Sequence, residues 1–249
     1  MIELKTAGEI DRMRRAGRVV AALLEHLARL VRPGITTKAL DEAAQAFLHQ
    51  QEAQPAFLGY RGFPASICVS VNEEVVHGIP GGRRLHEGDV VSLDAGAVVE
   101  GLYADAATTV TIGNVPAETQ RLIETTQHAL HEGISQAVVG HRISDISHAV
   151  QGVVEGAGFG VVRDFVGHGI GRALHEDPPV PNFGSPNNGP RLRAGMVLAI
   201  EPMVTAGHPD VEILSDGWTV ITKDRSLAAH FEHTIAITDH GPEILTKEL

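Results

Sequence analysis

Cysteine, aromatic residues and long apolar runs are all scarce in this chain. A single cysteine, Cys68, excludes an internal disulfide framework and a cluster of thiolate metal ligands, which agrees with a reducing compartment. No apolar run reaches the length of a membrane span, and the first residues, MIELKTAGEIDRMRRAG, contain no signal-peptide core. We therefore expect a cytoplasmic protein with no membrane partner.

Positive charge is also in short supply. The formal net charge is −11, which argues against general nucleic-acid binding because such binding needs a positive surface that displaces counterions. The local exception is the run Arg12, Arg14, Arg15 and Arg18, which on a helix usually forms a solvated face. The rest of the composition, with 43% hydrophobic and 20% charged residues, is that of a globular protein with a substantial core.

Apolar periodicity predicts helices near the start of the chain. Thr6 and Glu9 match a capping box, and the helical stripe that follows them stops at Pro33-Gly34. Thr36 then caps a second helix. We expect both helices to bury one apolar face.

The second half repeats this order of elements. Pro116 fits the first turn of a long helix, and Ser144 caps another that closes at Gly156 and Gly158. Strands are predicted at Val197–Ile200, Trp218–Thr222 and His233–Thr238, and loops at Asp177–Pro190 and Ala206–Asp216. The order predicts an α+β fold, one domain over residues 1–249, with halves of about 1–113 and 114–249 that arose by duplication.

A β-hairpin with two aspartates is predicted at Val90–Val110. Residues with high β-propensity flank a turn at Glu100-Gly101, and pairing about that turn sets Asp94 opposite Ala107. Asp105 then lies two residues along the partner strand, so both carboxylates point to the same face. Like charges within roughly 5–8 Å on a half-buried face need a shared proton or a cation. Taken alone, the stretch also fits two solvated aspartates near a turn.

Three more polar residues lie beside strand-like apolar sequence. His168 is flanked by glycines, Glu201 ends an apolar run and Glu232 begins another. Each of them alone fits a surface acid or a hydrogen-bonded histidine, but an acid at a buried strand end is costly unless it is paired or ligating. With Asp94 and Asp105 they form an oxygen-rich ligand set with one imidazole nitrogen, which suits two ions of Mn, Fe, Co or Zn.

These residues belong to motifs whose order resembles the type I methionine aminopeptidases. The motifs span nearly the whole chain and are VNEEVVHGIP at 71–80, SLD at 92–94, YAD at 103–105, GHGIG at 167–171, HE at 175–176, IEP at 200–202 and FEHT at 231–234. The resemblance implies the pita-bread fold, an α+β arrangement of two pseudo-symmetric halves with a central antiparallel sheet and outer helices.

The resemblance also implies roles for individual residues. The metal ligands would be Asp94, Asp105, His168, Glu201 and Glu232. Of these, Asp105 and Glu232 would bridge the two ions. Glu201 would be the general base, His175 would stabilise the oxyanion, and His77 would contact the amide nitrogen or help the amine leave.

The substrate pocket is the part that departs from the family pattern. By resemblance it would be lined by the two histidines His77 and His175 and by Phe57, Tyr60, Phe63, Cys68, Leu174 and Trp218. A small residue or a cysteine is common in the family where this chain has Phe57, and an aromatic residue is common where it has Leu174.

The implied function is removal of the initiator methionine from nascent polypeptides whose second residue is small, with two divalent ions (Co, Mn, Fe or Zn) as cofactors. Glu201 and Glu232 lie too close in sequence for the helical insertion of type II enzymes. Nothing precedes the first helix, where eukaryotic type I enzymes carry a zinc-binding extension, so a bacterial form is expected. We expect a monomer, and the Arg12–Arg18 face is a candidate for transient contact with the ribosome.

Two alternatives share the expected fold. Xaa-Pro peptidases use the same ligand set but generally carry an additional N-terminal domain. A binding protein could also retain the fold after losing its metals, although the intact ligand set argues against this.

Overall fold

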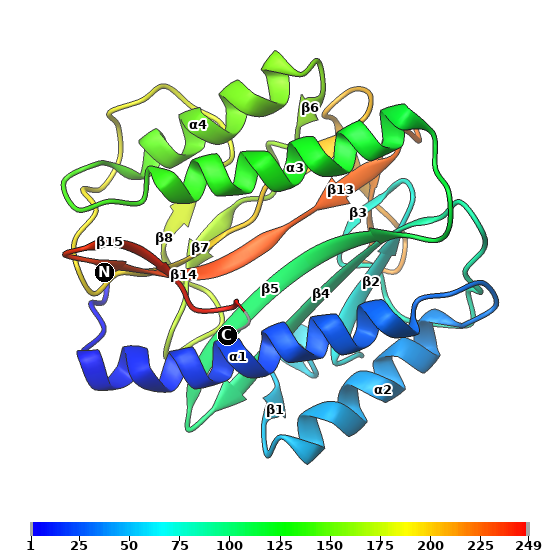
Figure 1. Cartoon of the computed structure of the whole chain (residues 1–249), viewed down its shortest axis with the longest axis horizontal. Coiled ribbons are helices and arrows are strands. Elements are labelled where there is room, and N and C mark those ends of the chain that lie inside the picture. The colour runs from blue at the N-terminus through cyan, green and yellow to red at the C-terminus, as the bar shows by residue number, and fades with distance from the viewer. Residues whose placement is uncertain (1, 248–249) are drawn as a thin grey trace.

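Two pairs of helices pack on a curled antiparallel sheet (Figure 1). Within residues 2–247, which this computed structural model describes, the α-helices are α1 (Ala7–Leu30), α2 (Thr37–Gln50), α3 (Ala117–Ser135) and α4 (Ile143–Gly156). α1 lies along one half of the sheet and α3 along the other, and both are on the same side of it. The predicted α+β class is confirmed.

The main sheet brings together strands from the whole length of the chain. Its strand order is β1-β4-β5-β14-β9-β7-β8, with β2 added beside β4 and β15 beside β14. The bounds are β1 Gln54–Pro55, β2 Ile67–Val71, β4 Val90–Val99, β5 Leu102–Thr111, β7 Gly167–Gly169, β8 Glu176–Val180, β9 Val197–Ile200, β14 Glu232–Thr238 and β15 Gly241–Ile244. Neighbouring strands are antiparallel throughout.

Two small antiparallel sheets complete the strands. One has the order β13-β10-β6 and the other β11-β12-β3. Their bounds are β3 Glu74–Val76, β6 Gly160–Val161, β10 Met203–Thr205, β11 Val211–Ile213, β12 Val220–Thr222 and β13 Ala228–His230.

The aspartate hairpin forms as predicted. β4 and β5 pair from Val90–Thr111 to Val99–Leu102, and Asp94 lies opposite Ala107. Glu100 and Gly101 both have positive φ, 49° and 75°. Such a two-residue turn has the twist that a hairpin requires, so the turn fixes the register.

The capping box at the start of α1 is confirmed. The amide of Thr6 donates to Oε2 of Glu9 over 2.8 Å, and the amide of Glu9 donates to Oγ1 of Thr6 over 3.3 Å. Thr36 caps α2 in the predicted way, because its Oγ1 accepts from the amide of Ala39 over 3.2 Å. The apolar stripe of α1 is buried against β4 and β5.

The predicted start of α4 was wrong. The helix begins at Ile143, so Ser144 lies inside its first turn and donates from Oγ to the carbonyl of Asn188 over 2.9 Å. Arg142 precedes the helix, and its amide donates to Oδ2 of Asp145 over 2.7 Å. Asp145 thus satisfies the amide at the helix start, which leaves Ser144 free to bind a neighbouring loop. Pro116 likewise precedes α3 instead of lying in its first turn.

Strands also occur where only loops were predicted. β8 overlaps the start of the Asp177–Pro190 segment and β11 lies within Ala206–Asp216, while β12 begins two residues after Trp218. The prolines of β8 fit because this strand is the edge of the main sheet, where a missing amide donor costs little.

Each half of the molecule has its own apolar core. One cluster joins α1 and α2 to β2, β4 and β5, and the other joins α3 and α4 to β9, β13 and β14. Isolated bridges join Thr36 to Arg84 and Arg142 to Arg191, so the residues before α2 and α4 are bound in the same manner. These parallels support the duplication, which remains a proposal.

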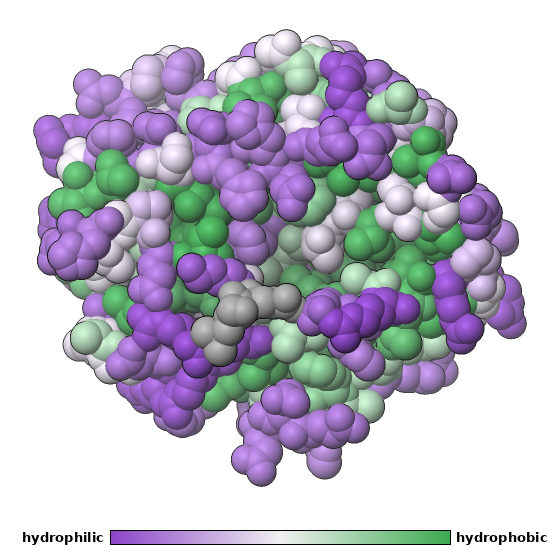
Figure 2. Space-filling model, viewed as in Figure 1, coloured by the Kyte–Doolittle hydropathy of each residue, from purple (hydrophilic) through white to green (hydrophobic). Residues whose placement is uncertain are grey.

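The surface over the helices is mainly polar. Figure 2 shows hydrophilic side chains along α1 and α3 and hydrophobic ones in the groove between them, where Leu24, Ala106 and Phe231 lie. None of the helices in residues 2–247 is long and apolar enough to cross a membrane.

Candidate active site

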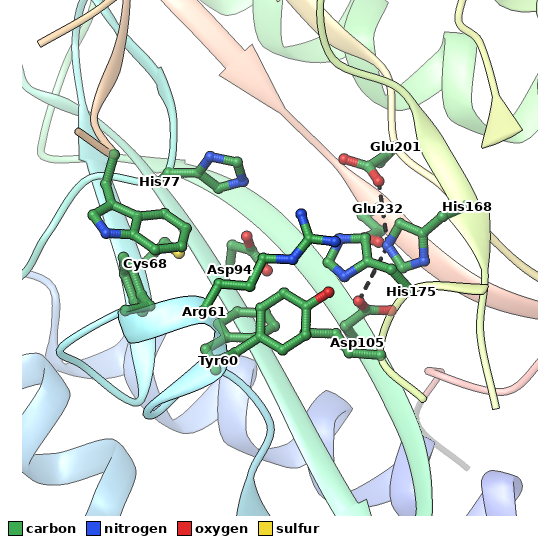
Figure 3. A pocket seen from close by; sticks show the side chains of 14 residues that line it. Tyr60, Arg61, Cys68, His77, Asp94, Asp105, His168, His175, Glu201 and Glu232 are labelled. Atoms are coloured by element: carbon green, nitrogen blue, oxygen red, sulfur yellow. Dashed lines mark ion pairs between the residues drawn. The ribbon is translucent and has the colours of Figure 1, made fainter. Parts of the chain in front are cut away.

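Every residue that the sequence assigned to metal binding, catalysis or the pocket lines one cavity of about 140 Å³ (Figure 3). These residues are Phe57, Tyr60, Phe63, Cys68, His77, Asp94, Asp105, His168, Leu174, His175, Glu201, Trp218 and Glu232. Arg61 also lines the cavity and was not predicted.

The five acidic and imidazole side chains of the predicted ligand set come from consecutive strands of the main sheet. Asp94 lies on β4, Asp105 on β5, Glu232 on β14 and His168 on β7, while Glu201 directly follows β9. Because these strands are neighbours in the order β4-β5-β14-β9-β7, the side chains converge although they are far apart in sequence.

His168 presents one ring nitrogen to the acids. Its Nδ1 lies 2.9 Å from the carbonyl of Gly169, which accepts its proton, so Nε2 is the free nitrogen. Nε2 lies 3.6 Å from Oδ2 of Asp105 and 3.6 Å from Oε1 of Glu201. One ligand atom each from Asp105, His168 and Glu232 lie within 4.8 Å of one another, a separation that one metal ion can span.

The four carboxylates repel one another in a site where Asp105 and Glu232 are buried and Asp94 and Glu201 are half-buried. Burial, followed by the charge of Asp105, raises the pKa of Asp94 and Glu201 well above the usual range, and the same causes raise that of Glu232. Burial raises the pKa of Asp105 from 3.8 to about 7. A set of this kind needs protons or cations to be stable.

Two of these oxygens have no hydrogen-bond partner among the described residues. They are Oδ1 of Asp94 and Oε1 of Glu232, and both are fully buried. An unsatisfied buried oxygen is costly. The unpaired oxygens, the crowding and the free imidazole nitrogen together fit the requirements of divalent cations.

Two neutral histidines stand beside this cluster. Burial lowers the pKa of His77 to about 4, and burial lowers that of His175 to about 3 with help from the charges of His168 and Arg61. The ring of His175 lies 4.1 Å from that of His168, centroid to centroid. The ring of His77 makes edge contacts with Phe165 and Trp218, at 5.6 and 6.2 Å.

Ion pairs hold the loop that carries His175. Glu176 accepts from the amides of Arg172 and Ala173 over 2.6 and 3.1 Å, and the buried Nζ of Lys5 donates to its other oxygen over 2.5 Å. Arg172 also pairs with Glu9 of α1 over 2.6 Å. The N-terminal segment therefore fixes the position of His175.

One end of the cavity is an apolar slot. Phe57, Phe63 and Leu174 are buried there, and the rings of Phe63 and Trp218 meet edge to face at 5.1 Å. Cys68 lies opposite Asp94 in the pairing of β2 with β4. Burial raises the pKa of the Cys68 thiol, so the thiol remains protonated and forms a hydrogen bond with the Asp94 carboxylate. The slot thus ends next to the ligand cluster.

His230 is a buried residue of the site that the sequence reasoning missed. Its Nε2 lies 3.8 Å from Oε2 of Glu201 and has no hydrogen-bond partner in residues 2–247. Burial lowers its pKa to about 3. The signal was available, because a histidine between apolar residues and directly before the FEHT motif is itself a costly placement.

Comparisons with known proteins agree with this site. Residues 11–239 match the model of metallopeptidase family M24. The methionine aminopeptidase of Clostridium acetobutylicum is 53% identical over 99% of this chain and 99% of its own length. The crystal structure of methionine aminopeptidase from Thermotoga maritima superposes with a TM-score of 0.98 at 48% identity over 100% of both chains.

A more distant likeness concerns the fold alone. Prolidase from Pyrococcus furiosus superposes with a TM-score of 0.82 at 20% identity over 99% of this chain and 66% of its own. The predicted pita-bread fold is therefore confirmed, whereas the Xaa-Pro alternative gains no support at that identity. The chain belongs to metallopeptidase family M24, among its methionine aminopeptidases.

Proposed function

We propose that the chain is a metal-dependent aminopeptidase that removes the N-terminal methionine of polypeptides whose second residue is small. The observation that carries the proposal is the junction of an apolar slot with a buried cluster of four carboxylates and the free Nε2 of His168. A cavity of about 140 Å³ is close to the roughly 150 Å³ that accommodates a benzene-sized molecule, so it suits a single side chain.

The ligand set would hold two divalent ions, with Co, Mn, Fe and Zn as candidates. Asp94 would bind one ion, His168 and Glu201 the other, and Asp105 and Glu232 would lie between them. When bound, such ions act as Lewis acids that activate water and polarise the peptide carbonyl.

Glu201 is suited to accept the proton of the attacking water. Its Oε1 faces His168, whereas Oε2 lies on the side of His230. Burial and the neighbouring acids raise its pKa above that of an ordinary glutamate, which makes its carboxylate a stronger base. The same carboxyl group can then return the proton to the leaving amine.

His175 and His77 would act on the peptide bond as neutral imidazoles. A neutral ring donates one hydrogen bond, so His175 can stabilise the carbonyl oxygen as its negative charge develops. His77 lies on the opposite wall, beside Trp218, and is suited to contact the amide nitrogen of the scissile bond (Figure 3).

The slot suits methionine because that side chain is long, flexible and polarizable. Sulfur gains from contact with aromatic rings, and Tyr60, Phe63 and Trp218 supply three of them. With the first side chain in the slot, the second residue lies at the rim near His77 and the ligands.

Hydrolysis assays test the proposal directly. We expect the purified protein to cleave Met-Ala-Ser, and to cleave Ala-Pro and Gly-Pro poorly, with Mn, Co, Fe and Zn titrated in turn. Preferential cleavage of the proline substrates would favour an Xaa-Pro peptidase. Metal analysis that finds no bound ion under any condition would favour a binding protein.

The natural substrate would be the N-terminal methionine of nascent polypeptides in the cytoplasm, bound by a monomer. Contact with the ribosome through the Arg12–Arg18 face has a structural obstacle. Arg14 pairs with Glu243 and Arg15 with Glu100, each over 2.7 Å. These pairs would have to open, so a solvated face is the interpretation that we favour.

A further inference from the structure

Arg61 is the one cationic side chain among the residues that line the cavity. Its backbone lies in the short 3-10 turn Tyr60–Gly62, and its side chain is exposed at the cavity mouth. No carboxylate of residues 2–247 lies within ion-pair distance of it. Figure 3 shows the guanidinium extending across the space between His77 and the ligand cluster.

The turn projects this side chain at an energetic cost. Arg61 has φ 48°, between Gly59 at φ 81° and Gly62 at φ 89°. This left-handed backbone region disfavours residues other than glycine and asparagine, because Cβ comes close to the following carbonyl oxygen. Hydrogen bonds across the turn from Phe63 to Tyr60 and from Gly59 to Phe63, of 2.9 and 2.8 Å, hold it in place. The position is therefore held firmly, and it carries a long cation that pairs with no acid of the described residues.

A succession of ring contacts places an upper limit on the distance of Arg61 from the ligand cluster. Its Cζ lies 5.4 Å from the ring of Tyr60, that ring stacks on His175 at 5.2 Å, and His175 lies 4.1 Å from His168. An extended peptide advances about 3.3–3.6 Å per residue. The guanidinium is thus within reach of a substrate residue a few positions beyond the scissile bond.

Arg61 differs in charge from the other side chains at the mouth of the cavity. The other nitrogen-bearing side chains that line the cavity are the imidazoles of His77, His168 and His175 and the indole of Trp218, and none of them is a lysine or an arginine. Two divalent cations would match the charge of the four carboxylates. A free guanidinium in such a place binds carboxylates well, because its planar donors can form two parallel hydrogen bonds.

We infer that Arg61 binds an acidic side chain of the substrate beyond its second residue, so that the enzyme prefers Met-Ala-Glu sequences to Met-Ala-Lys sequences. The inference rests on the proposed function and narrows its substrate class to peptides with an acid near the third position. The alternative for Arg61 is a packing role, in which its cation merely covers the ring of Tyr60.

The test compares kcat/KM for C-terminally amidated Met-Ala-Glu-Gly, Met-Ala-Gln-Gly and Met-Ala-Lys-Gly. For the wild type we expect the glutamate peptide to exceed the lysine peptide about fivefold, and the ratio to shrink as salt is added. Arg61→Gln should bring the ratio close to one, and Arg61→Glu should reverse it. Arg18→Gln, which changes an exposed arginine of α1 outside the cavity, is the matched control and should leave the ratio unchanged.

Several results would overturn the inference. An unchanged ratio in Arg61→Gln would do so, as would an equal loss for all three peptides, which indicates packing on Tyr60. A gain in kcat/KM that appears only when the C-terminal amide of the peptide is replaced by a free acid would assign the contact to the terminal carboxylate instead of the glutamate side chain. If the wild type cleaves none of these peptides, the proposed function fails as well, whereas cleavage of all three without preference leaves that function intact.

Discussion

Nε2 of the buried His230 and Oε2 of the half-buried Glu201 lie 3.8 Å apart. A donor at this distance can orient the carboxylate, because a small shift brings the two atoms within hydrogen-bond range. We predict that His230→Leu lowers kcat about tenfold with little change in KM, since an oriented base matters most in the transition state. His230→Gln, which keeps a donor, should retain most of the activity.

Steady-state kinetics and thermal melting of both variants check this prediction. A similar loss of kcat in His230→Gln and His230→Leu, accompanied by similar losses of melting temperature, would mean that the imidazole serves packing alone. Unchanged kinetics in the leucine variant would contradict any role for the His230–Glu201 contact.

Asp94 is expected to destabilise the protein when metal is absent. Its Oδ1 is buried and unpaired, and the charge of Asp105 repels it. Stripping the metal from the wild type should therefore lower the melting temperature, and adding Mn or Co should restore it. Asp94→Asn should instead stabilise the metal-free protein by on the order of 1–3 kcal/mol at about pH 8 and abolish the response to metal.

The stability that Asp94→Asn adds to the metal-free protein should increase with pH. The pKa of Asp105 is about 7 in the folded chain against an ordinary value of 3.8. The stability that protonation of Asp105 contributes to the folded state is fully present below about pH 4 and is lost as the pH rises through 7. The advantage of Asp94→Asn over the wild type should thus be largest above pH 7 and shrink as the acids of the wild type take up protons. A gain that is independent of pH would contradict the charge explanation.

His77 and His168 should respond differently to substitution. His77 has φ 60°, so asparagine is a better replacement than alanine at this backbone position. We predict that His77→Asn lowers turnover by about 10²–10⁴-fold while bound metal stays near the wild-type content. His168→Ala should lower both quantities. Metal analysis alongside kinetics decides, and loss of metal in the His77 variant would show that it is a ligand.

Local chemistry made much of the site predictable from the sequence. The Glu100-Gly101 turn fixes the register of the hairpin, so the shared face of Asp94 and Asp105 follows from counting. The other ligands were recognised from the cost of polar groups at the ends of apolar strands and from the order of the family motifs. Their convergence depends on the strand order, which no local pattern encodes.

The errors arose where tertiary contacts decide the structure. The DPPV segment forms β8 because it lies at a sheet edge, a place that cannot be read from its own residues. Asp145 rather than Ser144 satisfies the start of α4 because the Asn188 loop binds the serine. Arg61 escaped notice because a lone arginine on a glycine-flanked turn usually faces solvent.

The last prediction concerns the size of the second substrate residue. With methionine in the slot, the second residue would pass a rim formed by His77, Trp218 and the ligand cluster, all of which line the cavity. His77 is itself held between Phe165 and Trp218, so this wall has little room to move. Small residues (Gly, Ala, Ser, Thr, Pro, Val or Cys) should be tolerated there, and Leu, Lys, Arg, Glu or Phe rejected.

A misfit should cost less free energy in the slot than at the rim. A methylene-sized difference in an apolar pocket changes binding by only about 1–3 kcal/mol, so norleucine in place of methionine should cost a measurable but modest amount. A clash with a rigid rim can exceed this, because overpacking alone costs about 1–3 kcal/mol and the scissile bond is displaced as well. We therefore expect kcat/KM to fall steeply from Met-Ala-Ser to Met-Val-Ser to Met-Leu-Ser. Comparable cleavage of Met-Ala-Ser and Met-Lys-Ser would refute the rim as a size gate even if the metal assignment holds.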